Sequence, residues 1–91
     1  MTKTATKKLP ETALKRDVSS MRKVLANRLY ELRIAADLSQ AALAEVAGID
    51  RKTINRIENG HFSPSLDTLT RLSVVLKCRL AELVEHKRAR K

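Results

Sequence analysis

Apolar residues recur three and four positions apart along most of this chain, which is the spacing of one face of an α-helix. The spacing continues upstream of residue 21 through Leu14 and Val18. The first helix can therefore begin near Glu11, next to Pro10, or only at residue 21, because the adjacent serines before it are poor helix formers. The strongest part of its apolar stripe consists of Met21, Val24, Leu25, Leu29, Leu32 and Ala36.

Two short helices separated by a tight turn are predicted within residues 38–60. Each has a polar N-cap and a following glycine, because Ser and Asp side chains satisfy free N–H groups and glycine adopts left-handed backbone readily. The first helix covers residues 40–47 and the second covers residues 51–59. The first of these helices has the cap Ser39, the inward residues Leu43 and Val46, and the closing glycine Gly48. The second has the cap Asp50, the inward residues Ile54 and Ile57, and the closing glycine Gly60.

Two more helices complete the pattern. The fourth covers about residues 66–76 behind a cap at Ser63 or Ser65, and the fifth covers about residues 80–85. Their predicted inward residues are Leu66, Leu69, Leu72, Val75, Leu76, Leu80, Leu83 and Val84.

The alternation of apolar and polar residues that marks strands is absent from the sequence, so the predicted fold class is all-α, a compact bundle of five helices. A chain of 91 residues supports one hydrophobic core. The predicted domain covers residues 21–85. A basic N-terminal arm, residues 1–20, precedes it as a possible helical extension, and a basic tail, residues 86–91, follows it.

The chain is strongly basic, with 19 Lys and Arg against 10 Asp and Glu and a net charge of +9. A small basic domain favours a polyanionic partner, nucleic acid first and an anionic membrane surface second. Aromatic residues make up only 2% of the sequence, which disfavours base stacking on single strands. A lone cysteine, Cys78, and the lack of a long apolar run predict a cytoplasmic protein without a membrane span.

The predicted helix at residues 51–59 opens with two cations. Arg51 and Lys52 occupy its first turn, where the helix dipole disfavours positive charge by roughly 0.3 to 1 kcal/mol each. Such a helix suits the major groove of double-stranded DNA, where Arg and Lys donate to guanine O6 and N7. Asn55 can pair with adenine or face solvent, and Arg56 lies on the same outward side. The competing interpretation is an ordinary solvated face.

With these helices placed, residues 29–84 resemble the lambda-repressor-like helix-turn-helix family, also called the Cro and repressor or XRE family. The resemblance rests on the ordered segments LSQ, LAE, AGI, TINRIENG and PSLDTL. It implies a five-helix bundle in which helices two and three bind a palindromic operator as part of a homodimer. The chain departs from the family pattern between the last two helices, where Lys77, Cys78 and Arg79 replace a glycine, a small apolar residue and a Ser or Thr cap.

The resemblance also implies roles for individual residues. Arg51, Lys52 and Arg56 match base-reading positions, while Gln40 and Asn59 match phosphate-contacting positions. His61 follows the recognition helix closely enough to contact a phosphate. A structural ion pair between Arg33 and Glu58 also matches some members of the family. Apart from the resemblance, the predicted dimer surface is helix five through Leu80, Leu83 or Val84, with Leu14 and Val18 of the N-terminal extension as a possible addition.

The predicted function is a transcriptional repressor of phage or plasmid type, without enzymatic activity, cofactor or metal. An antitoxin that binds a toxin protein and represses its own operon is the main alternative, and a role at a membrane surface is a weaker one. The basic arm either contacts the DNA minor groove or packs on a partner subunit. Its cations are Lys3, Lys7, Lys8, Lys15 and Arg16.

Overall fold

The computed structural model describes residues 7–86, so residues 1–6 of the predicted arm, including Lys3, and residues 87–91 of the predicted tail lie outside it. The described chain contains five helices and no strand. The all-α prediction is therefore confirmed. The helices are α1 (Glu11–Ala35), α2 (Gln40–Ala47), α3 (Arg51–Glu58), α4 (Leu66–Val75) and α5 (Leu80–Val84).

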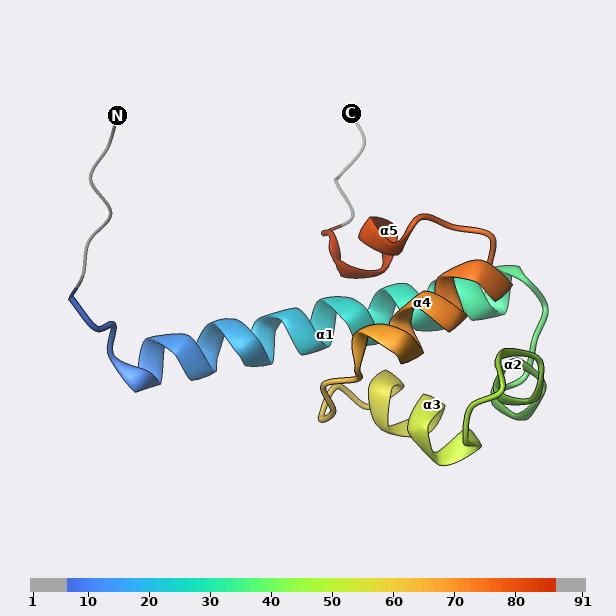
Figure 1. Ribbon diagram of the computed structural model, residues 1–91, viewed down its shortest axis with the longest axis horizontal. Coiled ribbons are helices and arrows are strands. Elements are labelled where there is room, and N and C mark those ends of the chain that lie inside the picture. The colour runs from blue at the N-terminus through green and yellow to red at the C-terminus, as the bar shows by residue number, and fades with distance from the viewer. Residues whose placement is uncertain (1–6, 87–91) are drawn as a thin grey trace.

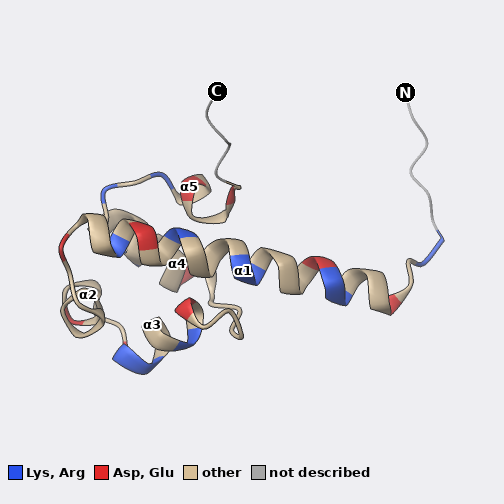
Figure 2. Cartoon of the chain, turned by 180° about the vertical axis from the view of Figure 1, so that it is seen from behind, with Lys and Arg blue, Asp and Glu red and all other residues tan. Residues whose placement is uncertain are grey.

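Helix α1 is one continuous helix of 25 residues that begins after Pro10. The earlier of the two predicted starts is correct, because two serines cost only part of a kcal/mol each and no Gly or Pro interrupts the run. Figures 1 and 2 show the N-terminal half of α1 extending past the other helices, with α3 below α1 and α5 above it in both views.

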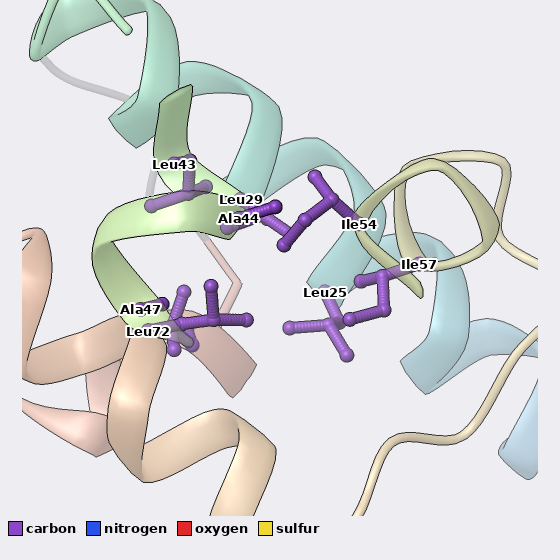
Figure 3. Packing of buried hydrophobic residues seen from close by; sticks show 9 residues of the cluster. Leu25, Leu29, Leu43, Ala44, Ala47, Ile54, Ile57 and Leu72 are labelled. Carbon is purple, nitrogen blue, oxygen red and sulfur yellow. The ribbon is translucent and has the colours of Figure 1, made fainter. Parts of the chain in front are cut away.

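The core lies where α1 to α5 converge (Figure 3). Its fully buried side chains come from every helix, which explains why the short helices hold together despite their length. Partly buried residues, including Cys78 and Phe62, pack around this centre. The fully buried side chains are Leu29, Leu43, Ile54, Ile57, Leu72 and Leu83.

Three residues predicted to face inward are instead exposed, and Val84 at the end of α5 is one of them. Val46 and Leu66 each expose 65% of their surface. Helix α2 turns Leu43, Ala44 and Ala47 inward, and the small alanines permit close contact on that side, which leaves Val46 outside. Leu66 occupies the first position of α4, ahead of the turns that pack on the core.

The helix boundaries follow the predicted caps with one difference. Ser39 Oγ accepts from the Ala42 N–H over 3.0 Å, and Ser65 Oγ accepts from the Thr68 N–H over 3.1 Å. Ser65 rather than Ser63 is therefore the cap of α4. Asp50 takes the N-cap position of α3 but makes no capping hydrogen bond with its side chain.

The turn between α4 and α5 uses a residue other than glycine. Lys77 adopts a left-handed conformation with φ 56, at the place where the family resemblance predicted a glycine. Arg79 takes the N-cap position of α5, and the Glu82 carboxylate accepts its backbone N–H over 2.7 Å. This hydrogen bond is the glutamate half of a capping box, which satisfies the N–H of the N-cap residue itself. Within residues 7–86, no helix is both long and apolar enough to cross a membrane.

Candidate nucleic-acid interface

Helix α3 presents a cationic outer face at the edge of the molecule. Ile54 and Ile57 are fully buried and fix the helix on the core, so the residues between and before them point outward. Arg51, Lys52 and Arg56 are exposed, and their side chains make no hydrogen bond or ion pair with any other described residue. Figure 2 shows this basic colouring along α3. Three cations are therefore available to an external anion.

The C-terminal end of α3 is tied to α1 by an ion pair between Arg33 and Glu58. Arg33 Nε donates to Glu58 Oε2 over 2.6 Å, and its Nη2 donates to Oε1 over 2.9 Å. The two side chains are only 9% and 7% exposed. Hydrogen bonding to the carboxylate raises the pKa of Arg33, so the guanidinium stays charged. Such bidentate pairs restrict orientation as well as distance, which holds α3 at one angle to α1.

Arg33 also connects to the segment that leads into α2. Its Nη1 donates to the Leu38 carbonyl over 2.9 Å, and its guanidinium lies 5.4 Å from the centre of the Tyr30 ring. All three nitrogen atoms of the guanidinium thus donate hydrogen bonds. The pair predicted from the sequence is present and joins three parts of the chain rather than two.

A chain of amide hydrogen bonds continues from Glu58 along α3. Gln40 Nε2 donates to Glu58 Oε1 over 3.0 Å, and Asn55 Nδ2 donates to Gln40 Oε1 over 3.3 Å. Asn59 Nδ2 in turn donates to Asn55 Oδ1 over 3.1 Å. Gln40 therefore braces α3 against α2. Asn55 keeps one free N–H and one free lone pair toward solvent.

The turn between α2 and α3 is held by backbone geometry. Gly48 has φ 70, which favours glycine, and the Ile49 N–H donates to the Ala44 carbonyl over 2.8 Å. Arg71 of α4 donates to the Ala47 carbonyl over 3.2 Å. A Cβ atom on Gly48 would lie 3.0 Å from that guanidinium, which would have to shift slightly, and the left-handed φ adds strain for any other residue. The angle between the two helices is set here.

The structure brings together most of the predicted site residues. Gln40 begins α2 and is linked through Asn55 to Asn59, which follows the last residue of α3, and exposed His61 lies two positions further along the chain. The predicted dimer residues are more dispersed. Leu14 and Val18 are exposed on the extended part of α1.

One predicted dimer residue is corrected by its burial. Leu83 is fully buried in the chain's own core and offers no side-chain surface to a partner. Leu80 is half-buried against the same core, whereas Val84 is exposed at the end of α5. Cys78 is half-buried as well, and burial, followed by the charge of Glu82, raises the pKa of its thiol.

Two cations of α1 lie beside the end of α3 and were not among the predicted site residues. Arg22 Nε donates to Ser63 Oγ over 2.8 Å, and Lys23 Cγ lies 3.9 Å from the position of a Cβ on Gly60. Lys23 is exposed and adds positive charge next to the outer face of α3. The helical spacing of Lys23 from the buried Ala26 was the signal that could have placed it there.

Comparisons with known proteins agree with this geometry. The HTH_3 helix-turn-helix family matches residues 29–83. The restriction-modification controller protein C.AhdI from Aeromonas hydrophila shares 35% identity over 68% of this chain and 94% of that protein, with a TM-score of 0.66.

Two further solved structures are similar. An HTH_3 family transcriptional regulator from Vibrio cholerae has 27% identity and a TM-score of 0.68 over 72% of this chain, which spans 37% of that protein. The hypothetical transcription factor NHTF from Neisseria has 24% identity and a TM-score of 0.69, covering 74% of this chain and 75% of that one. This last similarity concerns the fold alone. Comparison with curated proteins gives no match.

Proposed function

The chain belongs to the HTH_3 helix-turn-helix family, and we propose that it represses transcription by binding a palindromic DNA operator as a homodimer. Its family and its structural relatives make it a DNA-binding transcription regulator. The finer proposal concerns how it recognises DNA and in what oligomeric state.

The observation that carries the proposal is the cationic outer face of α3. Arg51, Lys52 and Arg56 are exposed and have no hydrogen-bond or ion-pair partner among residues 7–86. Side chains of this kind on a protruding helix donate to guanine O6 and N7 in the major groove. We assign base reading to these three residues. Asn55 adds a bidentate contact to adenine through its free N–H and lone pair.

Phosphate contacts would set the register of α3 on the duplex. The side chain of Gln40 is engaged with Glu58 and Asn55, so its contribution comes chiefly from the backbone N–H at the start of α2, where the helix dipole favours an anion. Asn59 and His61 follow the C-terminal end of α3, Lys23 lies beside Gly60 there, and all three can contact the DNA backbone near this end. These contacts position the protein but carry little sequence information.

A dimer is proposed because one α3 contacts only a few base pairs. Two copies related by a two-fold axis read two half-sites that are about one helical turn, roughly 34 Å, apart. An operator with that symmetry would bind both copies with higher affinity than either copy alone.

Substitution of Arg51 tests the base-reading role. We expect Arg51→Ala to weaken operator binding by about 1 to 3 kcal/mol and to relax the preference at one base pair. Operators with every base at each position would be compared by fluorescence anisotropy at fixed salt. Lys77→Ala is the matched control, because it removes one exposed cation from the turn between α4 and α5.

Two results would contradict this assignment. One is an equal loss of affinity for operator and random DNA on Arg51→Ala, since a phosphate contact weakens both alike. The other is a protein whose affinity does not depend on base sequence at all, which would refute the proposed operator recognition.

A further inference from the structure

An apolar groove of about 320 Å³ lies beside the extended half of α1. Its floor consists of α1 residues, and its wall comes from the loop between α3 and α4 and from the end of α5. The apolar lining residues are Val18, Met21, Leu25, Phe62, Pro64 and Val84. We call this surface the α1 groove.

We propose that the α1 groove binds residues 11–22 of α1 from a second copy of the chain, and that the second copy binds the first in the same way. The two α1 helices run antiparallel across a two-fold axis close to Val18. This inference rests on the proposed function, since it names the surface through which the repressor dimerises.

The apolar stripe on α1 is continuous with the groove. Leu14, Val18 and Met21 are between 38% and 47% exposed, and they lead directly to the buried Leu25. The four residues are spaced four, three and four apart, which is the seam of a pair of packed helices. The core therefore covers only the C-terminal end of the stripe, at Leu25, and the stripe continues toward the N-terminus on the exposed part of α1. A second copy of the same stripe has matching length and chemistry.

Charges beside the stripe are complementary in an antiparallel pair. Glu11, Val18 and Arg22 share one side of α1, and Glu11 and Arg22 lie on opposite sides of Val18 along the helix. Antiparallel packing across Val18 brings Glu11 of one copy within about one helical turn of Arg22 of the other. A parallel pair would place identical charges side by side. The charge order therefore favours the antiparallel arrangement.

The positions of α3 and α5 around α1 allow both recognition helices to face one DNA molecule. Ala26 faces Gly60 at the end of α3, while Arg28 Nε donates to the Glu82 carbonyl of α5 over 2.9 Å. Residues two apart are separated by about 200° around a helix, so α3 and α5 lie on opposite sides of α1. The apolar stripe of α1 lies on the side of the helix between the side that carries α3 and the side that carries α5. A two-fold axis along the α3 to α5 direction thus leaves both α3 helices on the same side.

The resulting spacing agrees with the pitch of DNA. Helix α3 crosses α1 near residue 29, because Ile54 and Ile57 pack with Leu25 and Leu29 (Figure 3) and Glu58 pairs with Arg33. Residue 29 is eleven positions from Val18, or about 16 Å at 1.5 Å per residue, so the two copies place α3 about 33 Å apart. Half-sites on successive helical turns are roughly 34 Å apart.

The same arrangement puts positive charge between the two half-sites. Lys15 and Arg22 are spaced from Ala26 by eleven and four residues, so they lie on the α3 side of α1. In the dimer, both copies of these cations gather on the DNA side near the axis. Backbone phosphates between the half-sites would offset their mutual repulsion.

Sedimentation of charge variants tests the surface. Wild-type protein is expected to sediment at twice 10.2 kDa and Val18→Glu at 10.2 kDa, because two carboxylates would meet at the axis. Val74→Glu is the matched control, since Val74 is 69% exposed on α4 and away from the groove. Ala81→Glu probes the exposed face of α5, and it should also leave the dimer intact.

A cysteine variant tests the same contact without a new charge. In a Cys78→Ser background, Val18→Cys should form a disulfide-linked dimer on oxidation, and Val74→Cys should not. A monomeric wild type, a dimeric Val18→Glu, or dissociation by Ala81→Glu alone would each overturn the proposed surface.

Binding to DNA separates failure of the surface from failure of the function. Val18→Glu should lose about 100-fold or more in affinity for a full operator while keeping the wild-type base preference on a single half-site. A variant that stays dimeric and binds the operator normally contradicts only the surface. Loss of base preference in every protein, wild type included, contradicts the repressor function itself.

Discussion

Glu58 connects three helices of the binding unit through a single side chain. Its carboxylate accepts two hydrogen bonds from Arg33 on α1 and one from Gln40 on α2, while its backbone belongs to α3. The position of the cationic face relative to the core thus depends on one buried anion. A buried pair of this kind adds little net stability, but removal of one partner leaves an uncompensated charge.

We expect Glu58→Ala to destabilise the fold by about 3 kcal/mol, because Arg33 would remain buried and unpaired. Urea unfolding monitored by circular dichroism measures this change. Glu45→Ala is the control, since Glu45 is exposed on α2. The double substitution Arg33→Met with Glu58→Ala should recover part of the loss. A cost below about 1 kcal/mol for Glu58→Ala would show that the pair is solvated rather than buried.

Among the connecting elements, the α4 to α5 turn holds a residue other than glycine in the left-handed region. Lys77 holds φ 56, a conformation in which Cβ crowds the backbone, and its N–H donates to the Val74 carbonyl over 3.2 Å. The turn also positions Cys78 and α5 against the core. A residue without Cβ would keep the same backbone path with less strain.

Lys77→Gly is therefore expected to stabilise the protein by roughly 1 kcal/mol, because αL strain at a residue other than glycine costs about that much. Thermal unfolding should show a raised Tm. Lys77→Ala serves as the control, since it removes the same charge but keeps Cβ, and its Tm should remain near that of wild type. Equal stabilisation by both variants would assign the effect to charge instead of backbone conformation.

Helix α1 has two roles along its length. Its C-terminal half supplies Leu25, Leu29 and Arg33 to the core and to the ion pair, while its N-terminal half contacts little of the bundle. The helix continues through Ser19 and Ser20 because the two serines weaken it only slightly. Other helices pack against only its C-terminal half. The exposed half is the element on which the proposed dimer depends.

For the molecule as a whole, binding to DNA should depend steeply on salt. The net charge of +9 predicts that the logarithm of affinity falls with the logarithm of salt concentration by about 0.9 per neutralised phosphate. Lys15→Ala should make this slope shallower on the full operator by about 1 to 2, since each dimer loses two cations near the axis. Base preference should stay unchanged.

Salt titrations of wild type and Lys15→Ala on the same operator measure this difference. Lys77→Ala removes an equal exposed charge from the turn between α4 and α5 and provides the comparison. A slope that is unaltered by Lys15→Ala would place that lysine away from the duplex. A flat titration for the wild type would contradict the electrostatic contribution altogether.

Local signals in the sequence were sufficient for the fold class, the five helices and the family. Helix caps, turn glycines and apolar spacing depend only on a few neighbouring residues, so the sequence alone predicts them. The examples here are the caps Ser39 and Ser65, the turn at Gly48 and the buried isoleucines of α3. The outward position of Arg51 and Lys52 follows from the same periodicity. Their contact with bases remains a prediction.

These local signals did not predict the contacts between segments that are distant in the sequence. Which side chains are buried depends on which helices meet and at what angle, as the exposed Val46 and Leu66 and the buried Leu83 illustrate. The hydrogen bond between Asn55 and Gln40 depends on the same packing. Helical spacing identifies an apolar face but not the extent to which other helices cover it. The α1 groove exists because the bundle ends before the stripe of α1 does, and that limit arises only when all five helices pack.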